Sequence, residues 1–251
     1  GAIADTAGRR MPWIVFFSVL YVLGSAALWF AVPGYEHVWL ILVAFGIGLI
    51  GMEFATIFTN ALLPGLTTAQ DTGRVSGSGF AFGYWGGVLS LAIMLGLFAE
   101  NDAGVTLLGQ PPAFGLDAGT REGTRFVGPF TAVWYVLFMV PFFLWVREPR
   151  TIDPRRAKLD VALALGDLWA SVRGVLRRPS LAAYLGSSMF YRDALNGLYG
   201  FGGIYAIGVL EWSIVQIGVF GVVGAIAAAI FSWLGGLADR RYGPKPVIVF
   251  C

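Results

Sequence analysis

Three charged side chains stand in long apolar stretches of the chain, where a charge is costly. Glu53 lies in the stretch Val38–Leu63, and Arg192 and Asp193 lie together in Leu181–Val209. A charge at the middle of a bilayer costs about 2.5–3.5 kcal/mol on insertion scales, so such residues usually face a cavity or pair with one another. We therefore interpret all three as candidates for substrate or proton handling. The alternative is an ion pair with a purely structural role.

Two amides extend this candidate site. Asn196 follows Asp193 by three residues and so shares its helix face. Asn60 lies in the same apolar stretch as Glu53, and its alternative role is a hydrogen bond between two helices. We expect Glu53 to act as a protonatable carboxylate. The site would then be coupled to a proton gradient, with no cofactor and no metal.

The elements that position these residues are predicted to be membrane-spanning helices. Only 13% of the residues are charged and 57% are hydrophobic, against about 25% charged residues in a soluble domain. A spanning helix needs about 20 mainly apolar residues. The stretches of this length are Trp13–Val32, Val38–Leu63, Gly77–Ala99, Val127–Val146, Leu181–Val209 and Ser213–Leu234, and a seventh begins at Val247. The sequence thus predicts an all-α, polytopic bundle of transmembrane helices.

The basic residues between the spans predict the orientation of the chain. Fourteen Lys and Arg residues fall in the opening segment and in every second loop, and the alternate loops hold only Arg121 and Arg125. Cytoplasmic loops collect basic residues. We therefore expect both ends of this chain to be cytoplasmic.

Two loops are long. Glu100–Phe126 faces outside, is rich in Gly and Pro, and is predicted to form an irregular cap. Arg147–Pro179 is cytoplasmic, and apolar residues recur in its second part at three- and four-residue spacing, from Val161 to Leu176. This pattern predicts an amphipathic helix at the membrane surface that links two halves of the molecule.

Glycines at four-residue spacing form a ridge in the third span. Gly79, Gly83 and Gly87 fall on one helix face. Small residues at this spacing let membrane helices approach closely, so we expect the ridge to serve helix packing.

A short motif occurs twice. Three of the five residues of Gly1–Asp5 recur in Gly235–Asp239, at an offset of 234 positions, and Pro12 recurs as Pro246. Six predicted spans separate the copies, so both lie on the same side of the membrane. This spacing indicates parallel six-helix repeats.

The first copy of the motif carries a resemblance to a known family. Gly1, Asp5, Gly8, Arg9 and Arg10 match the G-x-x-x-D-x-x-G-R-R pattern of the major facilitator superfamily, and the chain resembles that superfamily throughout. The resemblance implies a fragment that covers helices three to eight of twelve. Residues 1–146 would then belong to the N-terminal six-helix half, residues 147–179 to the linker, and residues 180–251 to the beginning of the C-terminal half.

The second copy keeps Asp239 and Arg240 but departs from the pattern after Arg241. On the resemblance, the aspartates and arginines of both copies would form a cytoplasmic gating latch between neighbouring helix ends. The alternative is that the aspartates are ordinary turn or helix-cap residues.

A narrower resemblance is to the vacuole-effluxer-like branch, which includes autophagy-related vacuolar amino-acid exporters and bacterial relatives. It is carried by Asn60–Pro64, by Arg74–Gly87 with its glycines and Tyr84, and by Asp193, Asn196 and Tyr205 in the fifth span. It implies efflux or exchange of amino acids or similar metabolites. We expect a monomer in a bacterial inner membrane, with a small-molecule substrate and the lipid bilayer as its partners.

Other classes of protein fit less well. A single histidine and a single cysteine exclude most metal-dependent and nucleophilic mechanisms, and neither Lys158 nor Lys245 follows a phosphate-binding loop. Basic residues confined to short loops argue against nucleic-acid binding. A drug or sugar carrier of the same superfamily, a non-catalytic membrane subunit and a channel stay open as alternatives to an amino-acid carrier.

Overall fold

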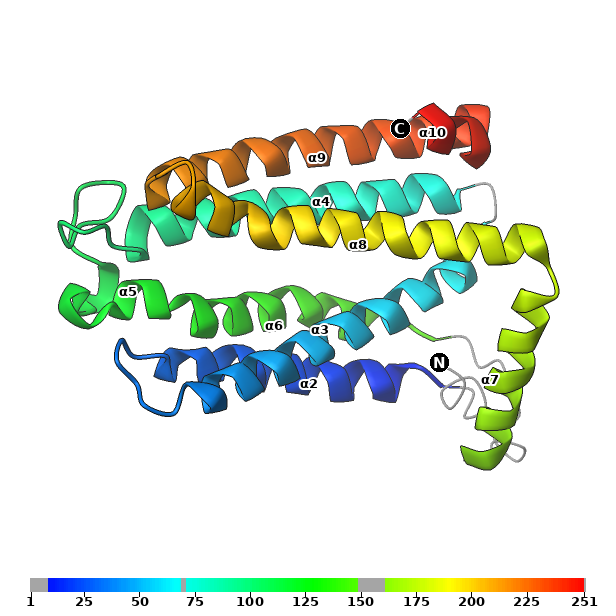
Figure 1. Ribbon diagram of the computed structural model, residues 1–251, viewed down its shortest axis with the longest axis horizontal. Coiled ribbons are helices and arrows are strands. Elements are labelled where there is room, and N and C mark those ends of the chain that lie inside the picture. The colour runs from blue at the N-terminus through cyan, green and yellow to red at the C-terminus, as the bar shows by residue number, and fades with distance from the viewer. Residues whose placement is uncertain (1–8, 69–70, 149–160, 251) are drawn as a thin grey trace. The chain divides into compact units, whose positions relative to one another are not determined.

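A computed structural model describes residues 9–68, 71–148 and 161–250. Every regular element among these residues is helical (Figure 1). The elements in chain order are α2 (Met11–Ala27), η1 (Leu28–Phe30), α3 (Val38–Leu66), α4 (Thr72–Ile93), η2 (Met94–Phe98), η3 (Ala113–Gly115), η4 (Ala118–Thr120), α5 (Glu122–Arg125), α6 (Val127–Trp145), α7 (Val161–Leu176), α8 (Pro179–Gly208), α9 (Ile214–Tyr242) and α10 (Pro244–Phe250). The all-α fold predicted from the sequence is confirmed.

Five helical segments are long and apolar enough to cross a bilayer. They are Met11–Phe30, Val38–Leu66, Thr72–Phe98, Glu122–Trp145 and Gln216–Tyr242. They match five of the six predicted spans to within five residues at each end, except that the last helix runs to Tyr242, eight residues beyond the predicted end at Leu234. The remaining predicted span forms the 30-residue helix α8, which is long enough but is not among the five. Its central charges and its glycines lower its hydropathy.

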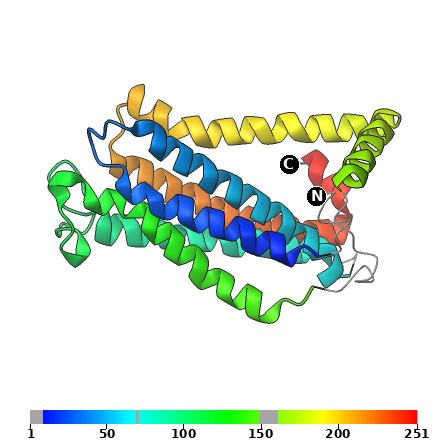
Figure 2. The same cartoon turned by 90° about the horizontal axis from the view of Figure 1, so that it is seen from below.

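The chain divides into two compact units. One contains α7 and α8 with the residues up to Ile217, and the other contains residues 11–148 together with Gly218–Phe250. In the smaller unit, α7 and α8 meet end to end at a steep angle (Figure 2). The helix predicted over Val161–Leu176 is present as α7, and Leu165, Leu168 and Val172 are exposed along it, while its role as a linker between two halves stays a prediction.

Glycine contacts hold α2 against α3 in the larger unit. A methyl group added at Gly24 would lie 2.5 Å from the Gly48 Cα, and one added at Gly51 would lie 2.5 Å from the Tyr21 backbone nitrogen. Such contacts require glycine, because any side chain would push the two backbones apart. Closer to the N-terminal end of α2, the Phe17 ring stacks on the Phe54 ring of α3 with centroids 4.8 Å apart.

The helix α6 packs on the other side of α2. The Ser18 and Tyr135 hydroxyls lie 2.8 Å apart, and the Tyr21 ring meets the Tyr135 ring edge to face. The predicted outer cap, between α4 and α6, contains short turns of helix joined by irregular backbone. In the same unit α4 runs alongside α9 (Figure 1).

Candidate functional site

Glu53 and Asn60 form a polar stripe on the side of α3 that faces away from α2. They lie seven residues apart, which is about two helical turns, and both are exposed. The buried face of α3 carries Ala55, Phe58 and Leu62, and it lies on the opposite side of the helix. The packing of α3 against α2 therefore leaves the stripe free to line a space on the other side.

The other candidate site residues share α8. Arg192, Asp193 and Asn196 stand near the middle of this helix and are exposed. Asp193 and Asn196 lie on one face, as their spacing predicts. Because α3 and α8 belong to different units, the structure describes the two halves of the candidate site separately. The roles assigned to these five residues stay predictions.

Polar side chains gather where the C-terminal end of α9 meets the N-terminal end of α4. The Asp239 carboxylate lies directly against Gly73 in the first turn of α4. The N-terminal end of a helix carries a partial positive charge, which favours a carboxylate at this position. Arg240 Nε lies 3.9 Å from Asp71 Oδ1, and Arg74 Nη2 lies 3.6 Å from the same oxygen.

This cluster contains Asp239 and Arg240, which belong to the second copy of the predicted gating motif. Asp239 and Arg240 both contact the beginning of α4, so the structure gives the second copy a definite partner. In the first copy, Asp5 and Gly8 lie outside the described residues, and Arg9 is exposed. The sequence reasoning did not identify Asp71 and Gly73 as the partners, since nothing in the local sequence links them to a segment more than 160 residues away.

Small residues continue this contact along α4 and α9. A methyl group added at Gly77 would lie 2.8 Å from the Ser232 carbonyl oxygen and 2.9 Å from the Gly236 Cα. Ala81 and Ala229, further along the two helices, are buried. We call this contact the α4–α9 seam. Its glycines, Gly73 and Gly77, have the four-residue spacing that could have revealed them in the sequence.

The predicted glycine ridge faces a different direction. A methyl group added at Gly79, Gly83 or Gly87 would meet no described atom of the same unit within 4 Å. Gly83 and Gly87 instead line an open groove between α2, α4 and α6. The packing role of this ridge thus stays a prediction, and the close helix contact of α4 is made by the α4–α9 seam.

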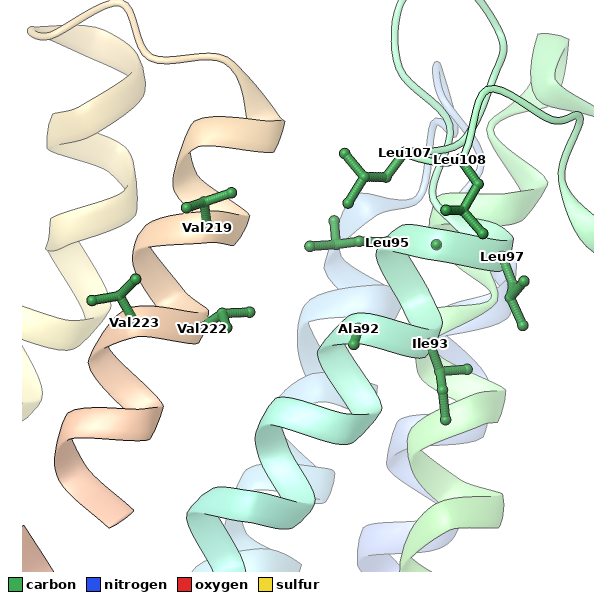
Figure 3. A pocket seen from close by; sticks show the side chains of 10 residues that line it. Ala92, Ile93, Leu95, Leu97, Leu107, Leu108, Val219, Val222 and Val223 are labelled. Carbon is green, nitrogen blue, oxygen red and sulfur yellow. The ribbon is translucent and has the colours of Figure 1, made fainter. Parts of the chain in front are cut away.

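A separate pocket of about 440 Å³ lies where the outer end of α4 approaches α9 (Figure 3). Ala92 and Leu95 come from the α4 side, Leu107 and Leu108 from the outer loop, and Val222 from α9. The side chains that line it are apolar, so it offers no group that could orient a polar substrate.

No group of three or more His, Cys, Asp or Glu side chains with the geometry of a metal site occurs among residues 9–68, 71–148 and 161–250. The candidate site therefore consists of carboxylates, an arginine and amides on helices of spanning length. Together with five apolar spans, these features define a polytopic integral membrane protein.

Comparison with known proteins gives the family. Residues 67–251 match the family model "Vacuole effluxer Atg22 like", so the chain belongs to this family. It is also 26% identical over 250 residues to "Uncharacterized MFS-type transporter YxiO" of Bacillus subtilis (strain 168). That alignment covers 99% of this chain and 54% of the relative, so the chain spans about half the length of the curated relative it matches. No solved structure matches the chain. The resemblance drawn from the sequence motifs is thereby confirmed.

Proposed function

We propose that the longer protein to which this chain corresponds is a secondary transporter that moves small solutes by alternating access. The family membership and the transporter relative support this proposal. The observation that carries it is the polar stripe of Glu53 and Asn60, turned away from the face of α3 that packs on α2. Ionisable residues within membrane spans are rare, face the bundle interior or a water-filled cavity, and mark substrate or ion pathways.

The substrate class proposed is amino acids or similar metabolites, moved out of the cytoplasm across a bacterial inner membrane. The description of the family as effluxers supports the direction. Glu53 and Asp193 would exchange protons with the gradient, while Asn60, Asn196 and Arg192 would bind the polar groups of the substrate. Both ends of this chain would lie in the cytoplasm, and the protein would act as a monomer without catalysing a chemical reaction.

Gating is proposed to involve the α4–α9 seam. Asp239 and Arg240 contact the beginning of α4, so they stabilise a state in which the cytoplasmic ends of these two helices are together. Opening the cytoplasmic side would separate these ends. A contact that is made in one state and lost in the other shifts the population between them.

The test is transport by the full-length protein in proteoliposomes. Labelled amino acids, sugars and a cationic drug are offered separately, with and without an imposed pH gradient. Amino-acid transport that depends on the gradient supports the proposal, while transport of sugars or drugs alone assigns a different substrate class. Absence of transport of every solute by a protein that is folded by circular dichroism would overturn the carrier function.

The site is tested by Asp193→Asn in the same assay. Coupled transport should be lost, because a neutral amide cannot carry a proton through the cycle, while folding and insertion should be retained. If Asp193 served only to neutralise Arg192, the double variant Arg192→Gln/Asp193→Asn would regain transport. Such a rescue would remove Asp193 from the site.

A further inference from the structure

The helix α7 exposes a row of large apolar side chains on one face. They recur at three- and four-residue spacing, each is more than 40% exposed, and they are Leu165, Leu168, Trp169, Val172 and Leu176. Asp167 lies on the opposite face of the helix. A contiguous apolar surface of this kind marks a site that binds a partner or a membrane.

Arginines flank this apolar face and continue beyond it. The Arg173 guanidinium lies over the Trp169 ring, 5.2 Å from the ring centroid. Arg177 and Arg178 form the junction between α7 and α8, and both are exposed. No carboxylate in the described part of the chain forms an ion pair with any of the three arginines. Their guanidinium groups are therefore placed to bind an anionic partner.

The junction lies at the depth of lipid phosphates when α8 crosses the membrane. Arg178 stands 14 residues before Arg192, which is near the middle of α8. A helix of this length spans about 21 Å. The distance from the centre of a bilayer to the outer limit of its headgroups is about 20–22 Å. Because α7 leaves the junction at a steep angle to α8 (Figure 2), it runs along the headgroup region.

The apolar face and the arginines together fit an anionic lipid surface. An interfacial helix buries its apolar face at the boundary of headgroups and acyl chains, and Trp side chains are enriched at this level. Residues 161–178 hold three arginines and one aspartate. Each arginine close to an anionic membrane strengthens binding by about five-fold. A zwitterionic headgroup offers no comparable gain, because its two charges cancel.

We propose that α7 and its junction with α8 bind anionic phospholipids of the cytoplasmic leaflet. The apolar face of α7 enters the boundary of headgroups and acyl chains, and Arg173, Arg177 and Arg178 bind the phosphates. The site selects lipids by the charge of the headgroup. This binding depends on α8 crossing the membrane and does not depend on transport.

The test measures which lipid lies next to α7 in the full-length protein. A bimane fluorophore is attached to Leu176→Cys in a cysteine-free background, since Leu176 is 72% exposed between Arg173 and Arg177. The protein is reconstituted into phosphatidylcholine vesicles. Small, equal fractions of phosphatidylglycerol or phosphatidylcholine, each with a quenching nitroxide on the acyl chain near the headgroup, are added in parallel.

The phosphatidylglycerol quencher should be enriched several-fold over the phosphatidylcholine quencher at Leu176→Cys. Val133→Cys on α6 is the control position, because Val133 is 67% exposed and no basic residue lies within seven positions of it. Quenching there should show no preference for either lipid. Equal quenching by both lipids at Leu176→Cys would overturn the proposed selectivity. Quenching by neither would show that α7 packs on protein, from this molecule or a second copy, and would overturn lipid binding altogether.

Charge variants assign the preference to the three arginines. Replacing Arg173, Arg177 and Arg178 together with Gln should abolish the preference for phosphatidylglycerol. Replacing the same three with Lys is the matched control and should retain the preference, because Lys keeps the positive charge. A preference that persists in the Gln variant, or one lost equally in both variants, would contradict binding of anionic headgroups by charge at this site.

Discussion

The Glu100 side chain, which follows η2 at the outer end of α4, contacts Thr124 in α5, the short helix directly before α6. Glu100 Oε2 accepts a hydrogen bond from the Thr124 backbone N–H at 2.9 Å, and Oε1 accepts one from the Thr124 hydroxyl at 3.0 Å. Glu100 is only 1% exposed. Next to it, Arg125 Nε donates to the Trp29 carbonyl at 2.9 Å, with the guanidinium over the Trp29 ring. The outer ends of α2, α4 and α6 are thereby tied together.

Glu100→Ala should destabilise the full-length protein by about 2 kcal/mol, because it leaves a buried N–H and a hydroxyl without their acceptor. The measurement is chemical or thermal unfolding in detergent. Asp102→Ala is the matched control. The Asp102 carboxylate pairs with Arg121 Nη2 at 3.2 Å, but the Asp102 side chain is fully exposed. Solvent screens such a pair, so the control should unfold like the wild type. Equal destabilisation by both variants would show that the whole loop matters and not the Glu100 contact.

Because of the α4–α9 seam, alanine substitution of two glycines of α4 should change the stability of the protein differently. Gly77→Ala places a methyl group 2.8 Å from a backbone oxygen of α9, so the helices must move apart at a cost of about 1–3 kcal/mol. Gly79→Ala meets no described atom of the same unit within 4 Å and removes a helical glycine, so stability should stay equal or rise by up to about 1 kcal/mol. Unfolding of the two full-length variants in parallel tests the seam. Similar destabilisation in both would argue against it.

The sequence predicted the spans well because length and hydropathy depend on local composition. Five of six predicted spans match the apolar helices, and the three- and four-residue spacing in Val161–Leu176 predicted α7. The predicted boundaries differ mainly where polar residues extend a helix beyond its apolar part, as at Thr72 before the predicted beginning at Gly77.

Pairings between helices could not be predicted in the same way. Glycine spacing marks a face that can approach another helix, but it does not name the partner. The sequence reasoning singled out Gly79, Gly83 and Gly87, while α9 packs on Gly73 and Gly77. The partners of the second motif copy were likewise hidden, because Gly73 comes near Asp239, and Asp71 near Arg240, only when α4 and α9 lie side by side.

Loss of the Asp239 contact should raise access from the cytoplasm. Thr56 is exposed on α3 between Glu53 and Asn60, so Thr56→Cys reports on the space beside the polar stripe. Asp239→Asn weakens a partly exposed contact worth about 0–1 kcal/mol, so the rate of labelling by an impermeant cytoplasmic thiol reagent should rise by up to about five-fold. Asp5→Asn should act in the same direction and more strongly, since the first copy of the motif matches the signature more fully.

The control for this measurement is Asp167→Asn on the exposed surface of α7, which should leave the labelling rate unchanged. Both motif variants should slow transport without altering which substrate is selected. Identical labelling rates in the wild type, Asp239→Asn and Asp5→Asn would show that neither aspartate acts in gating.

The helix α8 should cross the membrane although it is less apolar than the five other spans. It has 30 residues, about 45 Å of helix, and its charges lie near its middle, where a substrate cavity would shield them from lipid. Arg173→Cys, before α8, should therefore react with an impermeant thiol reagent only from the cytoplasm, and Glu211→Cys, after it, only from outside. Thr120→Cys, in the outer cap, gives the outside reference. If Glu211→Cys reacted from the cytoplasm while Thr120→Cys kept its outside labelling, α8 would lie on the membrane surface, and Asp193 could not belong to a mid-membrane site.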